Sequence, residues 1–165
     1  PLGALLCKDD ITDTIRAGSG FFPHGHTFMG HATAVAASLA TLKAIDEEKL
    51  LANVTARGAS ILKKLTGRLA DHPNVGDVRG RGLFLAVEFV KDKASTEPLD
   101  PATKTHKQIQ QAAFERGLMV YGMGGTIDGR SGDHVLIAPP YILSESQEEE
   151  LVDKLAKAVN RTCSG

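Results

Sequence analysis

The sequence predicts an α/β or α+β fold in which helices pack against one sheet. Two observations lead to this expectation. Segments with apolar residues at three- and four-residue steps alternate with short β-branched runs, and the second half orders them as strand, helix, strand, strand, helix. The chain has 165 residues, of which 42% are hydrophobic and 24% charged. This length and composition suffice to bury the core of one domain or slightly more.

The first elements along the chain are a strand and a short helix or turn. "LGALLC" (2–7) is short, apolar and bounded by turns, as buried strands are. "KDDITDTIRAG" (8–18) is polar and predicts a turn or a short helix. The next segment, "GFFPHGHTFMGH" (20–31), is rich in glycine and histidine. Loops of this kind usually lie at a surface or a functional site, so this loop is the first candidate site.

Two long helices are expected next. Residues 31–46 are dense in Ala and Leu and carry almost no charge before Lys43, which predicts a tightly packed helix buried on most sides. Between residues 47 and 70, aliphatic residues recur at helical spacing and predict a long amphipathic helix that ends at "DHPN". Its outward face is expected to carry the charged residues Lys63, Lys64 and Arg68.

The second half predicts three strands and two helices. A glycine turn, "RGRG", leads into the first strand, Gly117 ends the first helix, and a glycine-rich loop (122–133) separates the last two strands. Ser144 with Gln147, or Ser146 with Glu149, forms a capping box for the last helix. The expected elements are strands at 83–90 ("LFLAVEFV"), 118–121 ("LMVY") and 134–140 ("HVLIAPP"), and helices at 104–117 and 144–162.

Charge and cysteine content narrow the function classes. Nineteen basic residues against 20 acidic ones give a net charge of -1, so the sequence has no basic footprint for nucleic acid or an anionic membrane. Cys7 and Cys163 lack metal-binding or disulfide-framework spacing, which favours a reducing, cytoplasmic setting. We find neither a membrane-spanning apolar run nor a signal peptide. The chain starts without Met on a strand-like run, so we expect it to belong to a longer protein.

The histidine-rich loop has three possible interpretations. His24, His26 and His31 resemble a metal-ligand set, but no nearby Cys, Asp or Glu completes one, so we expect no metal. The histidines could instead satisfy backbone groups at the start of the following helix. Thr27 offers a third possibility, because a hydroxyl and free N–H groups before a helix favour a phosphate. The phosphate interpretation fits these residues best.

Four blocks in order carry a resemblance to a known family. "HGHTFMGHATAVAASLATL", preceded by "PLGA", resembles the "HGxTFxGHP" segment of the class-III pyridoxal-phosphate-dependent aminotransferases of fold type I. "VGDVRGRGLFLAVEFV", "ERGLMVY" and "GDHVLIAPPYILSESQEEELVDKL" follow in the family's order. The resemblance covers essentially the whole chain. It is greatest to the omega-aminotransferases, which act on amines or omega-amino acids with pyruvate or a similar keto acid.

The resemblance implies an architecture. Residues 1–46 would be the end of the large cofactor-binding domain and the start of the interdomain helix. Residues 47–165 would be the rest of that helix and a small C-terminal α/β domain, with helices packed on a mainly antiparallel sheet. The family's Schiff-base lysine would lie upstream of Pro1, so no catalytic residue is assigned. The lysines of this chain lie in charged contexts typical of solvated faces, among them Lys8, Lys43, Lys63 and Lys64.

The resemblance also implies roles for three residues. Thr27 would bind the phosphate of pyridoxal 5'-phosphate in the active site of a neighbouring subunit, joined by the backbone of His26, so the parent would be at least a homodimer. The alternative for Thr27 is a simple helix N-cap. Arg130 would be a mobile arginine that pairs with a substrate carboxylate and swings away for uncharged amines; a solvent-exposed arginine is the alternative.

Other functions remain open at this point. An aminomutase, decarboxylase or racemase could use the same cofactor, and a non-catalytic α/β interaction domain would need no lysine. Arg79 and Arg81 in "VRGRG" could suggest a phosphate loop, but no helix follows as a dinucleotide fingerprint requires. We therefore expect them to be surface charges beside a turn. The partners of the parent would be small amines or amino acids and keto acids.

Overall fold

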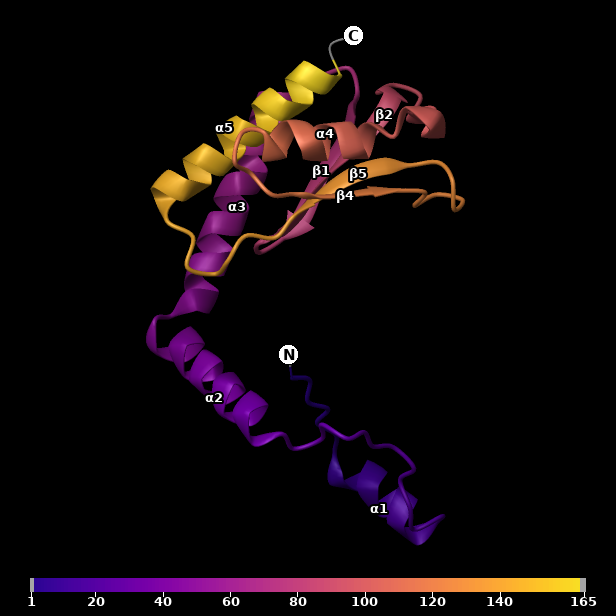
Figure 1. Cartoon of the computed structure of the whole chain (residues 1–165), viewed down its shortest axis with the longest axis vertical. Helices are drawn as coiled ribbons and strands as arrows, with labels where there is room; N and C mark the ends of the chain where they lie inside the picture. The colour runs from indigo at the N-terminus through magenta and orange to yellow at the C-terminus, as the bar shows by residue number, and fades with distance from the viewer. Residues whose placement is uncertain (1, 164–165) are drawn as a thin grey trace. The chain divides into compact units, whose positions relative to one another are not determined.

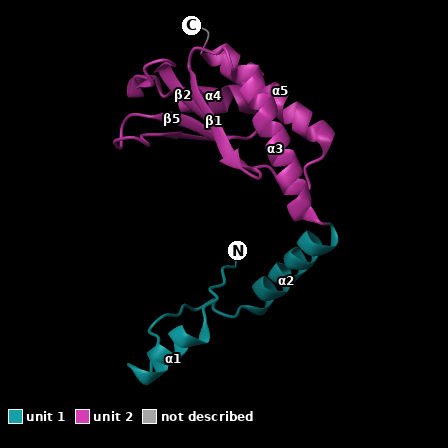
Figure 2. Ribbon diagram, turned by 180° about the vertical axis from the view of Figure 1, so that it is seen from behind, with its two compact units in different colours: residues 1–48 teal, residues 49–165 magenta. Residues whose placement is uncertain are grey.

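The structure is a computed structural model, and it describes residues 2–163. The chain divides into two compact units, Pro1–Glu48 and Lys49–Gly165, which Figure 2 colours separately. Lys49, at the boundary, has a left-handed backbone with φ of 52°. No helix within the described residues is long and apolar enough to cross a lipid bilayer.

The first unit contains two helices, α1 (Asp9–Ala17) and α2 (Ala32–Glu47). In α1, Asp9 and Asp10 lie in the first turn and Arg16 in the last, a distribution that complements the helix dipole. Both helices lie where the sequence placed them, so these two predictions are confirmed. No described residue of this unit is buried.

Two sequence predictions for this unit are wrong. Residues 2–7 form no strand, and the side chains of Leu5 and Leu6 are each 88% exposed. The predicted burial of α2 also fails, since Leu39 is 62% and Leu42 59% exposed. The physical reason is shared: an apolar run becomes a buried strand or helix only against a partner surface, and the described part of this unit offers none.

The second unit is an antiparallel sheet with helices, as predicted (Figure 1). The strands run in the order β1-β2-β5-β4, and every pair is antiparallel. The short β3 pairs with the end of β2, at Val90 and Asp92. The elements are α3 (Leu50–Leu69), β1 (Val75–Arg81), β2 (Phe84–Asp92), β3 (Glu97–Pro98), η1 (Pro101–Thr103), α4 (Thr105–Phe114), β4 (Tyr121–Gly124), β5 (Asp133–Ile137) and α5 (Glu145–Thr162).

One face of this sheet packs against the helices and forms the core. Burial alternates along β2 and β5, so every second side chain points to the same face. Helix α3 packs on β1 and α5, and α4 packs on β4, β5 and α5. The largest fully buried apolar side chains are Ile61, Leu65, Leu69, Leu85, Val87, Phe89, Ile109, Val135, Val152, Leu155 and Val159.

Glycine-rich strands were missed or shifted by the sequence prediction. "VGDVRGR" was expected to end in a turn but forms β1, where Val78 pairs with Val87 of β2. The turn itself lies at Gly82, with φ of 56°. "LMVY" was predicted as a strand, but β4 starts at Tyr121 and ends at Gly124. Glycine weakens strand propensity, yet at Gly122 a Cβ would lie 2.7 Å from the carbonyl oxygen of His106, so the packing of α4 requires it.

The capping box of α5 is confirmed. The hydroxyl of Ser144 accepts from the N–H of Gln147 at 3.2 Å, and Oε1 of Gln147 accepts from the N–H of Ser144 at 3.0 Å. This cap places Glu148 in the first turn, where its side chain is fully buried against α3.

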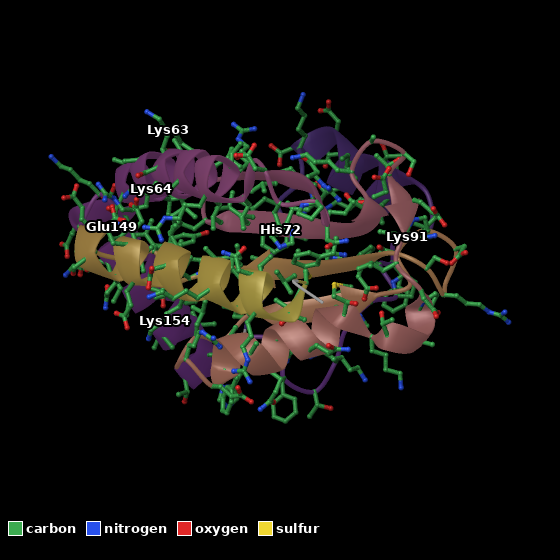
Figure 3. All side chains as sticks on the ribbon, turned by 90° about the horizontal axis from the view of Figure 1, so that it is seen from above. Lys63, Lys64, His72, Lys91, Glu149 and Lys154 are labelled. Carbon is green, nitrogen blue, oxygen red and sulfur yellow. The ribbon has the colours of Figure 1, made fainter. Side chains whose placement is uncertain are left out.

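The charged residues between α3 and α5 correct one more prediction. Lys64 was expected to face outward, but its Nζ lies 2.6 Å from Oε1 of Glu148, and it also pairs with Glu149. Figure 3 shows Lys64 beside Glu149, with Lys63 pointing away from them. Arg57 donates to the other oxygen of Glu148 at 2.9 Å. Glu148 is therefore a buried carboxylate held by two cations, which apolar periodicity alone does not reveal.

Candidate functional site

The first candidate site is the turn that precedes α2. Residues 27–30 form this turn, in which Gly30 has φ of 70°, and His31 is the N-cap of the helix. Nδ1 of His31 accepts from the N–H of Ala34 at 3.3 Å. The alternative that Thr27 caps the helix is therefore wrong, whereas the expectation that a histidine satisfies backbone groups at the helix start is confirmed for His31.

Thr27 lies in the turn with its hydrogen-bonding groups free. Neither its hydroxyl nor its N–H has a partner among the described residues, and the N–H groups of His26 and Phe28 donate to no acceptor there. The only bond of His26 within this turn comes from its carbonyl, which accepts from the N–H of Met29 at 3.0 Å. Unpaired donors just before a helix suit an anion such as a phosphate.

The two other histidines of the loop pack on aromatic rings. The ring of His24 lies 5.8 Å from that of Phe22, and the ring of His31 lies 6.1 Å from that of Phe28 in an edge-on arrangement. Each of these histidines thus has a packing or capping role. His26, like Thr27, is exposed.

The second candidate site is the loop between β4 and β5, which carries Arg130. The loop backbone is tied internally, because Oδ1 of Asp128 accepts from the N–H of Arg130 at 2.8 Å and of Ser131 at 2.6 Å. Two backbone hydrogen bonds, from Ile127 to Ser131 and from Gly129 to Gly125, add to this order. Arg130 is exposed, and its guanidinium forms no hydrogen bond or ion pair with any described residue. Its freedom to move therefore lies in the side chain.

A cavity of about 240 Å³ opens beside this loop. The basic side chains of Lys104, Lys107 and Arg130 line it, together with His106 and the carboxylate of Asp133. Among the described lining residues Asp133 is the single acid, and it is paired with the ring of His106. The cavity therefore presents an excess of positive charge and suits a carboxylate or another anion.

The His106–Asp133 pair was missed by sequence reasoning. The two residues lie 27 positions apart and belong to different elements, α4 and β5, so no local pattern joins them. Only the glycines of β4 gave a signal, because a glycine within a strand often marks a close approach.

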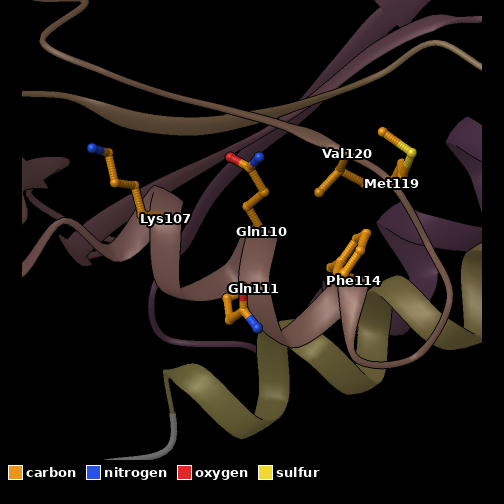
Figure 4. Close-up of a pocket in the computed structure, with 6 residues that line it drawn as sticks. All are labelled: Lys107, Gln110, Gln111, Phe114, Met119 and Val120. Carbon is orange, nitrogen blue, oxygen red and sulfur yellow. The ribbon is translucent and has the colours of Figure 1, made fainter.

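A second hollow, of about 460 Å³, lies along α4 (Figure 4). Phe114, Met119 and Val120 form its apolar part, and its one charged lining residue is Lys107. With a single charged group it lacks the excess of positive charge that the Arg130 cavity offers to an anion, so the Arg130 cavity is the stronger candidate.

Comparison with known proteins identifies the family. Residues 1–159 match the model of the class-III aminotransferases. An aminotransferase of Gibberella zeae is 40% identical over 160 residues, which cover 96% of this chain and 31% of that protein. The putrescine–pyruvate aminotransferase of Pseudomonas aeruginosa is 32% identical over 166 residues, covering 98% of this chain and 33% of that protein.

Solved structures agree with this match. The (S)-enantioselective omega-transaminase of Thermomicrobium roseum superposes with a TM-score of 0.81 at 35% identity, covering 93% of this chain and 32% of that one. The chain thus spans about a third of the length of the curated relatives it matches. The predicted family and the predicted fold class are both confirmed.

Proposed function

Because the chain belongs to the class-III aminotransferase family, we propose that it is part of a pyridoxal-phosphate-dependent enzyme. This enzyme transfers an amino group from an amine or omega-amino acid to a keto acid such as pyruvate. The name of the Pseudomonas aeruginosa relative, a putrescine–pyruvate aminotransferase, supports this pairing of substrates. The observation that carries the proposal is the turn before α2, whose free donors suit the cofactor phosphate.

Thr27 and His26 are the residues of this chain that would hold the cofactor. The hydroxyl and N–H of Thr27 would donate to phosphate oxygens, and the N–H of His26 would add a third donor. The absence of competing partners for these groups within the described residues supports this role. When bound, the cofactor supplies an electron sink for the substrate carbon that loses a proton.

Arg130 would bind the carboxylate of an omega-amino acid or keto acid. A guanidinium forms two parallel hydrogen bonds to a carboxylate, which a lysine does not. Two features support the role: the guanidinium of Arg130 has no partner among the described residues, and its cavity carries excess positive charge. The ordered loop fixes the Cα, and rotation of the side chain would admit uncharged amines.

We also propose that the parent is at least a homodimer. Residues 1–46 would be the end of the cofactor domain, and residues 47–165 would be the rest of the interdomain helix and the small domain. Apolar side chains in and before α2 are exposed in this chain, which supports the proposal that a second subunit covers them. These side chains are Phe21, Phe22, Phe28, Met29, Leu39 and Leu42. Sedimentation of the active parent as a monomer at micromolar concentration would contradict a shared site.

The activity is tested on the purified parent with its cofactor. We expect an amine donor and pyruvate to yield alanine and the carbonyl product in equal amounts. Release of carbon dioxide, migration of the amino group within one substrate, or loss of optical activity without transfer would assign the parent to a decarboxylase, aminomutase or racemase instead. Any of these without alanine formation would overturn the proposal.

A further inference from the structure

Asp133 is a buried acid on the core-facing side of the sheet. It begins β5 and alternates with Val135 and Ile137, which are both buried. Its side chain is only 4% exposed. Burying a carboxylate without a partner costs free energy, so Asp133 must be paired.

His106 supplies both partners of this carboxylate. Oδ1 of Asp133 accepts from the backbone N–H of His106 at 3.2 Å and also contacts Nδ1 of its ring. The ring is 14% exposed and packs against the backbone of Gly124, where a Cβ would lie 2.5 Å from ring atom Cε1. A glycine in β4 thus lets the imidazole reach the acid. A neutral imidazole with its proton on Nδ1 suffices for this bond.

The same pair lines the cavity that contains Arg130. Asp133 lies three positions after Arg130, at the base of the same loop, and is the only acid among the described residues that line the cavity. The other acid of this loop, Asp128, does not line the cavity, and its Oδ1 already accepts from the N–H groups of Arg130 and Ser131. If His106 did not hold Asp133, this carboxylate would compete for the guanidinium from within the cavity. An arginine paired with a neighbouring acid is not available to a substrate carboxylate.

We propose that His106 is a positioning residue for substrate specificity, acting through Asp133. By occupying the carboxylate of Asp133, His106 leaves Arg130 free to bind the carboxylate of a substrate. This role rests on the proposed function of Arg130. It concerns recognition of acidic substrates, and uncharged amines do not depend on it.

The test compares two donors of equal chain length, 4-aminobutyrate and 1-aminobutane, with the full-length parent. The donor half-reaction, followed through the absorbance of the cofactor, avoids the carboxylate of the keto acid. The measured quantity is the ratio of the apparent KM for 4-aminobutyrate to that for 1-aminobutane. We expect His106→Phe, which keeps a ring against Gly124 but removes the donor, to raise this ratio about tenfold or more, as for loss of a charged hydrogen bond.

Two control variants separate positioning from general damage. His106→Gln retains an N–H donor for Asp133 and should keep the ratio near that of the parent. The double variant His106→Phe with Asp133→Asn should restore the ratio, because a neutral amide does not capture a guanidinium. If His106→Phe does not fold, His106→Leu carries the same expectations. A merely structural role would change both donors alike and would not be rescued by Asp133→Asn.

A further variant, Arg130→Gln, separates the role of His106 from the role of Arg130. If Arg130→Gln raises the ratio and His106→Phe does not, the role of His106 is wrong and that of Arg130 stands. If Arg130→Gln leaves the ratio unchanged, both roles are wrong. If His106→Phe raises the ratio but Asp133→Asn does not restore it, capture of Arg130 by Asp133 is excluded.

Discussion

The two units of this chain have similar apolar helices but opposite degrees of burial. In α2, a helix dense in Ala and Leu, no residue is buried, whereas α3 buries Gly58, Ile61, Leu65 and Leu69. The second unit has a sheet and two further helices to receive its apolar face, and the described part of the first unit has neither. Apolar composition therefore indicates what a helix can bury, while topology decides whether it does.

The two proposed site residues, Thr27 and Arg130, therefore lie in units that differ in how well they are packed. The second unit has its own core and presents Arg130 on an ordered loop of that core. The first unit presents Thr27 on an exposed turn without a core of its own. We therefore expect the proposed cofactor contact of Thr27 to depend on surfaces outside this chain, and the proposed substrate contact of Arg130 to depend on the fold of the second unit.

Hydrogen exchange should show the largest difference. In the 165-residue chain alone, amides of α5 should exchange at least about a thousandfold more slowly than amides of α2. The reason is that the amides of α5 reach solvent only when the core of the second unit unfolds, whereas α2 has no core that must unfold first. In the full-length parent, α2 should become protected. Equal protection of α2 and α5 in the isolated chain would show that the first unit is stable by itself.

Removal of Glu148 should destabilise the second unit strongly. Glu148→Ala leaves Arg57 and Lys64 without their shared partner and should lower the free energy of unfolding by about 3 kcal/mol, measured by urea denaturation. Glu149→Ala is the matched control, because this side chain pairs with the same lysine but is 56% exposed. Its effect should stay within about 0.5 kcal/mol. Equal losses for the two variants would contradict a buried network.

Two glycines of α3 should respond in opposite directions. A Cβ on Gly58 would lie 2.1 Å from the carbonyl oxygen of Gly82, so Gly58→Ala should cost about 2 kcal/mol through overpacking. Gly67 has nothing within 4 Å of the same position, so Gly67→Ala should stabilise the helix by about 0.5 to 1 kcal/mol. A stabilising Gly58→Ala, seen as a higher melting temperature, would show that α3 and the β1–β2 turn are not in close contact.

Acid should weaken the second unit through Glu148. Burial by itself raises the pKa of this carboxyl group, but hydrogen bonds from Lys64 and Ser60 and the charge of Arg57 outweigh it and hold the pKa below its ordinary value of 4.5. The folded state therefore binds fewer protons than the unfolded state, and the stabilisation is complete above pH 4.5 and lost as the pH falls through the lower, folded pKa. Urea midpoints should fall less steeply with acid in Glu148→Gln than in the parent sequence. An equal dependence of the urea midpoint on pH in both proteins would show that Glu148 does not cause the loss of stability in acid.

Much of the fold could be predicted from local sequence. Helices α3 to α5 and strand β2 have strong periodicity, and the cap of α5 has a specific Ser144–Gln147 pattern. Strand β1 was missed and β4 was misplaced, because their glycines lower the strand propensity while allowing the close packing seen in the structure. The burial of α2 was predicted wrongly because a periodic pattern says nothing about where its partner surface lies.

The candidate site was only partly predictable. The resemblance to the family proposed Thr27 and Arg130 as site residues, and these roles stay predictions. The structure added that His31, not Thr27, caps α2. The pair of His106 and Asp133 depends on the packing of α4 against β4 and β5, which brings together residues distant in sequence. Such a contact follows from tertiary structure and has no local signature.

Cofactor affinity of the full-length parent tests the central claim, that Thr27 binds the cofactor phosphate. Thr27→Ala removes a hydrogen bond to a charged group, worth about 1.5 to 3 kcal/mol, and should weaken cofactor binding about tenfold to a hundredfold, while Thr27→Ser retains most of it. The melting temperature without cofactor should not change, since His31 caps α2. A cofactor dissociation constant within about twofold of the parent in Thr27→Ala, less than 0.5 kcal/mol, would contradict the claim.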